Sequence, residues 1–195
     1  MIRVNEIFHS LQGEGHNSGT AAVFLRLAGC NLQCPFCDTD HRDGTLMTES
    51  EAAEACARWA TPLVVITGGE PALQLNNALV DALHRHGKRI AVETNGTLRL
   101  PDGIDWITLS PKDLFLGEAA RPVLQSADEL KVVFDGRNLP PDYSHIAIRH
   151  DRFLQPCDTG DAARNAAVTA ATVEYIKAHP QWRLSLQIHK ILNIR

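Results

Sequence analysis

The apolar residues of this 195-residue chain fall into short continuous runs that alternate with segments of helical periodicity. Runs that are apolar at nearly every position are typical of strands buried on both faces of a parallel sheet. Such runs predict strands at 21–28, 63–67, 90–92, 106–109 and 130–134. Weaker strand patterns occur at 2–8, 146–148, 153–154 and 184–189.

Three helices are predicted between these runs. Thr48 and Glu51 form a capping box that begins the first helix, and Cys56 falls on its apolar face with Ala52, Ala55 and Trp59. Cys56 is therefore expected in the core rather than at a metal. A second helix has apolar residues at helical spacing from Leu75 to Leu83 and ends near Gly87, and a third spans about 162–178.

Strands that alternate with helices predict an α/β fold with a parallel sheet, and ligands of such folds bind at the carboxyl ends of the strands. Several of the predicted strands end in polar or glycine-rich segments. The helices are too few for a full eightfold barrel. We therefore predict a partial, reduced barrel of parallel strands, in one domain that spans residues 1–195.

Two interruptions of the apolar pattern leave alternatives open. Arg26 breaks the run at 21–28, where a buried arginine needs a partner: a structural salt bridge, or a bound anion at the end of the strand. Residues 10–15 form a glycine-punctuated loop, which is either a plain turn or a substrate clamp.

The strongest chemical pattern is the cysteine spacing C-x3-C-x2-C formed by Cys30, Cys34 and Cys37. Thiolates favour iron–sulfur, zinc or copper(I) sites. A structural zinc site needs four ligands, whereas three cysteines leave one iron of a four-iron cluster without a protein ligand. The alternatives are thiols packed in a core, or zinc completed by a histidine such as His41. Thr39, two residues on, is either a loop residue or a ligand of a hard cation.

Charge, hydropathy and cysteine content exclude several classes of protein. The net charge is −4, so a general polyanion-binding surface is not indicated, and no apolar run approaches the length needed to span a membrane. The N-terminal residues lack the pattern of a signal peptide, and five cysteines, three of them clustered, do not form a disulfide framework. We expect a cytoplasmic protein that binds neither nucleic acid nor membrane.

The cysteine spacing, with the aromatic Phe36 before the last cysteine, resembles that of the radical S-adenosylmethionine (SAM) enzymes. Five further motifs occur in order along the chain: residues 11–15 (LQGEG), 68–71 (GGEP), 93–96 (ETNG), 110–112 (SPK) and 187–190 (QIHK). Together they resemble the 7-carboxy-7-deazaguanine synthase family along almost the full length. The resemblance implies a lyase that converts 6-carboxy-5,6,7,8-tetrahydropterin to 7-carboxy-7-deazaguanine with loss of ammonia, in queuosine and 7-deazapurine biosynthesis, starting with hydrogen abstraction from C6.

The resemblance also implies cofactors, partners and residue roles. It implies a 4Fe-4S cluster, SAM and Mg²⁺, an electron donor such as flavodoxin, and a homodimer. Cluster ligands would be Cys30, Cys34 and Cys37, and Thr39 would help to hold Mg²⁺. SAM would contact Phe36, Cys37, Asp38, Gly69, Ser110, Pro111, Lys112, Gln155, Pro156, Cys157 and Asp158, with Glu93 and Asn95 near its ribose. The pterin would be surrounded by Leu11, Gln12, Gly13, Glu14, Arg26, Thr67, His189 and the carboxylate of Arg195.

Other interpretations of the same residues are a satisfied core histidine at His189 and a packing cysteine at Cys157. Many relatives have glycine at the position of Asn193, which can itself adopt a left-handed conformation. At the level of the whole chain, the rivals are a small radical SAM activase that acts on a partner protein and a non-enzymatic zinc-binding module.

Overall fold

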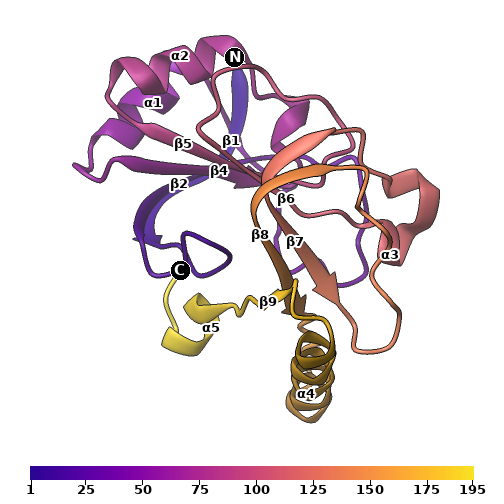
Figure 1. The fold of residues 1–195 in the computed structure, drawn as a ribbon. Coiled ribbons are helices and arrows are strands. Elements are labelled where there is room, and N and C mark those ends of the chain that lie inside the picture. Colours follow the sequence, from indigo (N-terminus) through magenta and orange to yellow (C-terminus); the bar gives the residue numbers. More distant parts are fainter.

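The computed structural model describes residues 1–195 and contains one nine-stranded sheet, in the order β3-β1-β2-β4-β5-β6-β7-β8-β9. β1 runs antiparallel to both of its neighbours, and all strands from β2 to β9 run parallel. The sheet curves but does not close (Figure 1). The strands are β1 (Ile2–Leu11), β2 (Ala21–Leu27), β3 (Thr45–Met47), β4 (Leu63–Gly68), β5 (Arg89–Thr94), β6 (Trp106–Leu109), β7 (Ser126–Phe134), β8 (Ala147–Pro156) and β9 (Arg183–Leu184).

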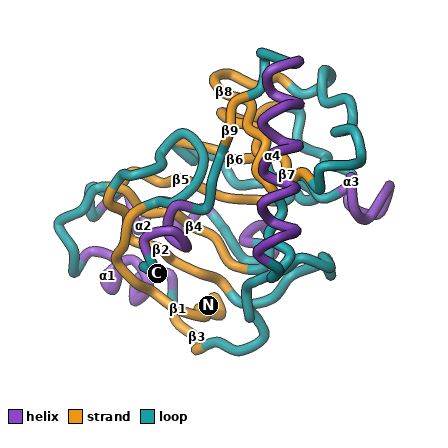
Figure 2. Tube along the Cα trace, turned by 90° about the horizontal axis from the view of Figure 1, so that it is seen from below, coloured by secondary structure: helices purple, strands orange, loops and turns teal.

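Few helices cover this sheet, as the sequence predicts. They are α1 (Glu49–Ala57), α2 (Asn77–Arg85), α3 (Asp113–Leu116), α4 (Ala162–Ala178) and α5 (Ile188–Leu192), with short 3-10 turns at Pro71–Leu73 and Gly117–Ala120. Helices α1 and α2 lie together beside the β1–β5 part of the sheet, and α4 lies by β8 and β9 (Figure 2). The predicted capping box begins α1, with the Glu51 amide donating to Thr48 Oγ1 over 3.2 Å.

Alternation along the strands separates a hydrophobic outer face from a mixed inner face. On β2, Val23, Leu25 and Leu27 join the large core that α1 and α2 cover, whereas Phe24 and Arg26 point to the other side. A second core lies between β6–β8 and α4. Both cores are continuous apolar layers, whose burial supplies the main driving force for this fold.

The inner face changes from apolar to polar along the strands. Its lower part is a cluster that includes Phe24, Val65 and Trp106, near the amino ends of the parallel strands. Two residues further along β2 and β4 stand Arg26 and Thr67, and both line a cavity. Residues two apart on a strand point to the same face of the sheet. The polar cavity therefore lies directly beyond the apolar cluster on the inner face.

The open side of the sheet is bridged by residues 185–195, which we call the C-terminal strap. This segment runs from β9 to the loop that follows β1 (Figure 1). The Ile188 amide donates to the Gly13 carbonyl over 3.0 Å, and the Gly15 amide donates to Ser185 Oγ over 3.0 Å. The β1 and β9 sides of the sheet are thus joined by loop contacts rather than by strand pairing.

Most predicted elements are confirmed, and the structure differs from the prediction in the following respects. The first strand extends to Leu11, the patterns at 146–148 and 153–154 belong to one strand, and β3 was not predicted. Trp59 lies beyond the end of α1 but packs against the same core. The prediction of a strand at 184–189 was wrong, because the chain leaves the sheet edge after Leu184 to reach the β1 loop and then forms α5. No helix in this fold has the length and apolar character needed to cross a membrane.

Candidate active site

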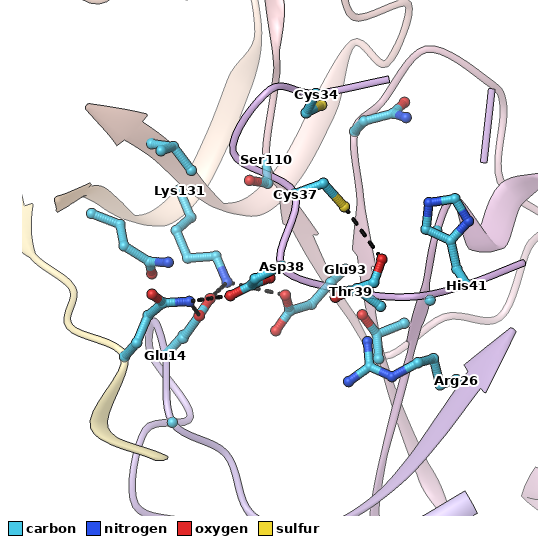
Figure 3. A pocket seen from close by; sticks show the side chains of 18 of the residues that line it. Glu14, Arg26, Cys34, Cys37, Asp38, Thr39, His41, Glu93, Ser110 and Lys131 are labelled. Atoms are coloured by element: carbon cyan, nitrogen blue, oxygen red, sulfur yellow. Dashed lines mark hydrogen bonds and ion pairs between the residues drawn. The ribbon is translucent and has the colours of Figure 1, made fainter. Parts of the chain in front are cut away.

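A cavity of about 270 Å³ opens at the carboxyl edge of the sheet, between the cysteine loop and the C-terminal strap (Figure 3). It brings together most of the residues that the sequence analysis singled out. Those that line it are Leu11, Gln12, Gly13, Glu14, Arg26, Cys30, Cys34, Phe36, Cys37, Asp38, Thr39, Thr67, Gly69, Ser110, Lys112, Gln155, Pro156, Asp158, His189 and Arg195. Glu93 and Asn95 also line it.

Two predicted contact residues lie outside this lining. Pro111 and Cys157 are both buried and do not face the cavity. Each directly follows a residue that does face it, Ser110 and Pro156. The Cys157 amide donates to the Phe134 carbonyl over 2.9 Å and so extends the β7–β8 pairing. Of the two interpretations given for Cys157, the structure favours the packing cysteine over the SAM contact.

The three clustered cysteines are free thiols on the cavity wall. Burial raises the pKa of Cys30 and of Cys34, and the Leu32 amide opposes this at Cys30 by donating to its sulfur over 3.4 Å. No three His, Cys, Asp or Glu side chains gather closely enough to hold a single metal ion. Three clustered thiols suit a four-iron cluster that keeps one iron without a protein ligand, and His41, the histidine considered for a zinc site, lines the same cavity.

Gly69 allows the cysteine loop to approach the end of β4. A Cβ at this position would overlap the Gly29 carbonyl oxygen and lie 2.7 Å from the Cβ of Cys30. The adjoining Glu70 amide donates to the same Gly29 carbonyl over 2.9 Å. Close approach of two backbones is what glycine permits, so Gly69 fixes the position of the first cysteine relative to the sheet.

Glu70 ties this corner to the end of β5. Its carboxylate is 1% exposed and accepts hydrogen bonds from Thr94 Oγ1, the Asn95 amide and the Ala72 amide, over 2.7, 2.7 and 2.9 Å. Burial raises the pKa of Glu70, and the three donors offset part of that cost. The GGEP and ETNG motifs are therefore joined through one buried carboxylate.

Arg26 makes the structural salt bridge that was one of its two alternatives, whereas the bound anion stays a prediction. Its Nε donates to Glu6 Oε1 over 2.8 Å, which is the structural salt bridge, and the residue also lines the cavity (Figure 3). Burial lowers the pKa of Arg26, and the Glu93 and Asp38 carboxylates oppose that effect. A guanidinium held in this way offers a fixed donor surface for an anionic ligand.

Lys131 is a cavity residue that the sequence analysis did not single out. Its side chain is 3% exposed and its ammonium lies between Glu14 and Glu93, with Nζ 3.0 Å from Glu93 Oε2 (Figure 3). Burial, the largest single effect, would raise the pKa of Glu14, but the charge and hydrogen bond of Lys131 together with the Gln187 hydrogen bond outweigh it and lower the pKa to about 2. The two carboxylates in turn raise the pKa of Lys131 despite its burial.

The C-terminal strap forms one wall of the cavity and is tied to the cysteine loop. Lys190 Nζ lies 2.6 Å from both Asp38 Oδ2 and Asp158 Oδ2. His189 is not a core histidine, because its ring lies against Gly13 on the cavity wall. Strap and cysteine loop are therefore linked by charge as well as by packing.

The last turn of the strap has the geometry that the sequence allowed. Asn193 has φ 52° and ψ 45°, and its amide donates back to the Lys190 carbonyl over 3.3 Å. The chain then turns towards β1, where Ser10 Oγ donates to the main-chain oxygen of Arg195 and the Arg195 guanidinium pairs with Glu6. A contact between the Arg195 carboxylate and substrate stays a prediction.

Several lining residues were not assigned a site role from the sequence. They are Phe8, Phe24, Leu32, Gly68, Thr94, Lys131, Val133 and Gln187. Phe8 and Phe24 stack with ring centroids 4.9 Å apart and form an aromatic floor. The sequence did contain a signal for Lys131. It is a single charged residue within an apolar strand, and such a residue needs a buried partner, as Arg26 does.

Three comparisons with known proteins, by family profile, by sequence and by structure, agree with one another. The Radical SAM superfamily profile matches residues 25–114. Two proteins named 7-carboxy-7-deazaguanine synthase, from Bacteroides thetaiotaomicron and Nitratidesulfovibrio vulgaris, are each 46% identical and are aligned over 100% and 98% of both chains, respectively. The solved structure "Crystal structure of QueE from Escherichia coli" is 29% identical, with a TM-score of 0.72 over 95% of this chain and 93% of that one. This chain therefore belongs to the 7-carboxy-7-deazaguanine synthase family of radical SAM proteins.

Proposed function

We propose that this protein converts 6-carboxy-5,6,7,8-tetrahydropterin to 7-carboxy-7-deazaguanine with release of ammonia, as a radical SAM lyase of queuosine or related 7-deazapurine biosynthesis. The observation that carries the proposal is one cavity in which three free thiols face a wall of charged and polar side chains. The full-length similarity to proteins that bear this name supports it.

Cys30, Cys34 and Cys37 would hold a 4Fe-4S cluster whose fourth iron is left for SAM. When bound, the cluster and SAM together supply the radical that removes hydrogen from C6 of the substrate. The residues of this chain bind, orient and shield. Gly69, with no side chain, would let SAM approach the end of β4, and Ser110, Lys112, Gln155 and Asp158 lie on the same cavity.

The substrate wall is formed by the residues nearer to the strap. Arg26 would bind the carboxylate of the pterin, because a guanidinium pairs well with that group. Glu14 is ionised at neutral pH and can accept hydrogen bonds from ring N–H groups. Gln12 and His189 line the same side of the cavity and would complete the polar contacts.

Further components are proposed on chemical grounds. Thr39 lies on the cavity wall and offers oxygen atoms for a Mg²⁺ ion shared with substrate. A one-electron donor such as flavodoxin would reduce the cluster. Five free thiols suit a reducing cytoplasm. We further propose one radical SAM domain over residues 1–195, supported by the single sheet, and a homodimer.

The cavity favours the lyase over the activase alternative. The strap closes one side of the cavity, which suits a small substrate beside the cofactors, whereas an activase must admit a polypeptide loop. The test is an anaerobic assay with reductant, SAM, Mg²⁺ and the carboxytetrahydropterin, read by mass spectrometry. Formation of the deazaguanine product is expected, and its absence with a fully loaded cluster would refute the assignment.

A further inference from the structure

Lys131 is the buried charge at the centre of the polar wall that the residue roles above leave unexplained. Its ammonium contacts Glu14 from the β1 loop and Glu93 from β5, while Lys131 itself comes from β7. Gln12 closes the ring: its Nε2 donates to Glu93 Oε1 over 2.7 Å, and its Oε1 accepts from the Glu14 amide over 3.3 Å. Four side chains from three parts of the chain thus form one hydrogen-bonded circuit.

The circuit determines which atoms of Glu14 remain for a ligand. Oε2 of this carboxylate contacts Lys131, and Oε1 accepts from Gln187 Nε2 of the strap over 3.0 Å. Each carboxylate oxygen has a second lone pair, so Glu14 can still accept hydrogen bonds from a ligand in the cavity. Because both oxygens are anchored, the direction of those remaining lone pairs is fixed before the ligand arrives.

A merely stabilising role does not account for this arrangement. A cation that is 3% exposed is costly to bury, and replacing a buried ion pair by packed apolar residues often costs no stability. Lys131 also lies on the cavity lining rather than inside a core. A circuit of this kind is useful where the direction of a carboxylate matters, as it does in a binding wall.

We propose that Lys131 is a positioning residue for the substrate: it holds the Glu14 carboxylate in the one orientation that accepts the ring N–H donors of the pterin. Glu93, itself held by Gln12, anchors the ammonium from the other side. This inference rests on the proposed function, because it takes the pterin as the ligand of Glu14. It assigns to Lys131 no contact with substrate or SAM.

The test is a double-mutant cycle on substrate affinity. Lys131→Met, Glu14→Gln and the double variant are compared with the wild type by calorimetric titration of the carboxytetrahydropterin, and by KM and kcat. We expect Lys131→Met to weaken binding by about 10- to 100-fold, the range for a charge-assisted hydrogen bond, and to raise KM far more than it lowers kcat. Adding Lys131→Met to Glu14→Gln should cause little further loss of substrate affinity, because Lys131 acts through Glu14.

Lys88 provides a matched control. It is 6% exposed and donates to the Trp59 and Thr61 carbonyl groups over 2.6 and 2.8 Å, away from the cavity. Lys88→Met should lower stability but leave substrate affinity unchanged. If Lys131→Met does not fold, as judged by circular dichroism, Lys131→Gln takes its place and the same non-additivity is required.

The outcomes separate the positioning role of Lys131 from the proposed function. Wild-type affinity in Lys131→Met, or effects of Lys131→Met and Glu14→Gln that simply add, would overturn the positioning role. Failure of the wild type and of Lys88→Met to bind the pterin would instead refute the proposed function.

Discussion

The contact between Gly69 and the cysteine loop gives a prediction whose size can be worked from the structure. Gly69→Ala would place a Cβ into the Gly29 carbonyl oxygen and 2.7 Å from Cys30 Cβ. Ordinary contact begins at 3.4 Å, so relief of the Cys30 contact alone requires the loop to retreat by about 0.7 Å in a packed region, and the closer overlap with the Gly29 carbonyl group requires more. Overpacking and a weakened hydrogen bond from the Glu70 amide together cost about 2–4 kcal/mol.

For a chain of this size that cost lowers Tm by roughly 4–16 °C. We expect the same displacement to move Cys30 and reduce both iron retained after anaerobic reconstitution and the spectral change on addition of SAM. Gly87→Ala is the control, because Gly87 has φ +69° and an added Cβ there meets nothing within 4 Å. It should lower Tm through backbone strain and leave iron content unchanged. Wild-type Tm and iron content in Gly69→Ala would refute the close-approach argument.

Three further predictions concern single side chains. Cys34→Ala should fold normally but lose cluster loading and SAM cleavage; a variant that still cleaves SAM would remove Cys34 from the ligand set. Glu14 has a pKa of about 2 against an ordinary 4.5, so its stabilising charge is present above pH 4.5 and lost as pH falls towards 2. Denaturant titration should therefore show wild type losing about 3 kcal/mol more than Glu14→Gln across this interval, and equal losses would contradict the assigned ion pair. Glu70→Gln replaces an acceptor oxygen by an NH₂ group within a buried site and should cost about 2 kcal/mol by the same titration, whereas an unchanged value would show that the Thr94 and Asn95 bonds contribute nothing.

The sheet and the cysteine loop could be predicted because their signals are local. Continuous apolar runs such as 63–67 identify buried strands, and three cysteines within eight residues need no tertiary information. The capping box at Thr48 is likewise a short-range feature, and α1 begins where it predicts. Family resemblance supplied the assembly of distant motifs into one site, which spacing alone does not give.

The parts that escaped prediction depend on long-range partners. The alternation in residues 184–189 has the period of a strand, but no neighbouring strand is available, and Ile188 instead meets Gly13 across the opening of the sheet. Lys131 belongs to the site only because Glu14 and Glu93 come to it from 117 and 38 residues away. A lone lysine in an apolar strand indicates a buried partner but does not say which one.

The way the strap joins the β1 and β9 sides of the sheet has a dynamic consequence. Between β1 and β9 there is no ladder of backbone hydrogen bonds, and the Ile188 amide and the Gly15 amide make two of the few bonds across this seam. Separating them leaves the nine-stranded ladder intact, so the seam can part by a sub-global fluctuation far cheaper than unfolding. Amide exchange at Ile188 should accordingly be orders of magnitude faster than at Ile66 in the centre of β4, and a bicyclic ligand can enter sideways through the gap that this fluctuation makes.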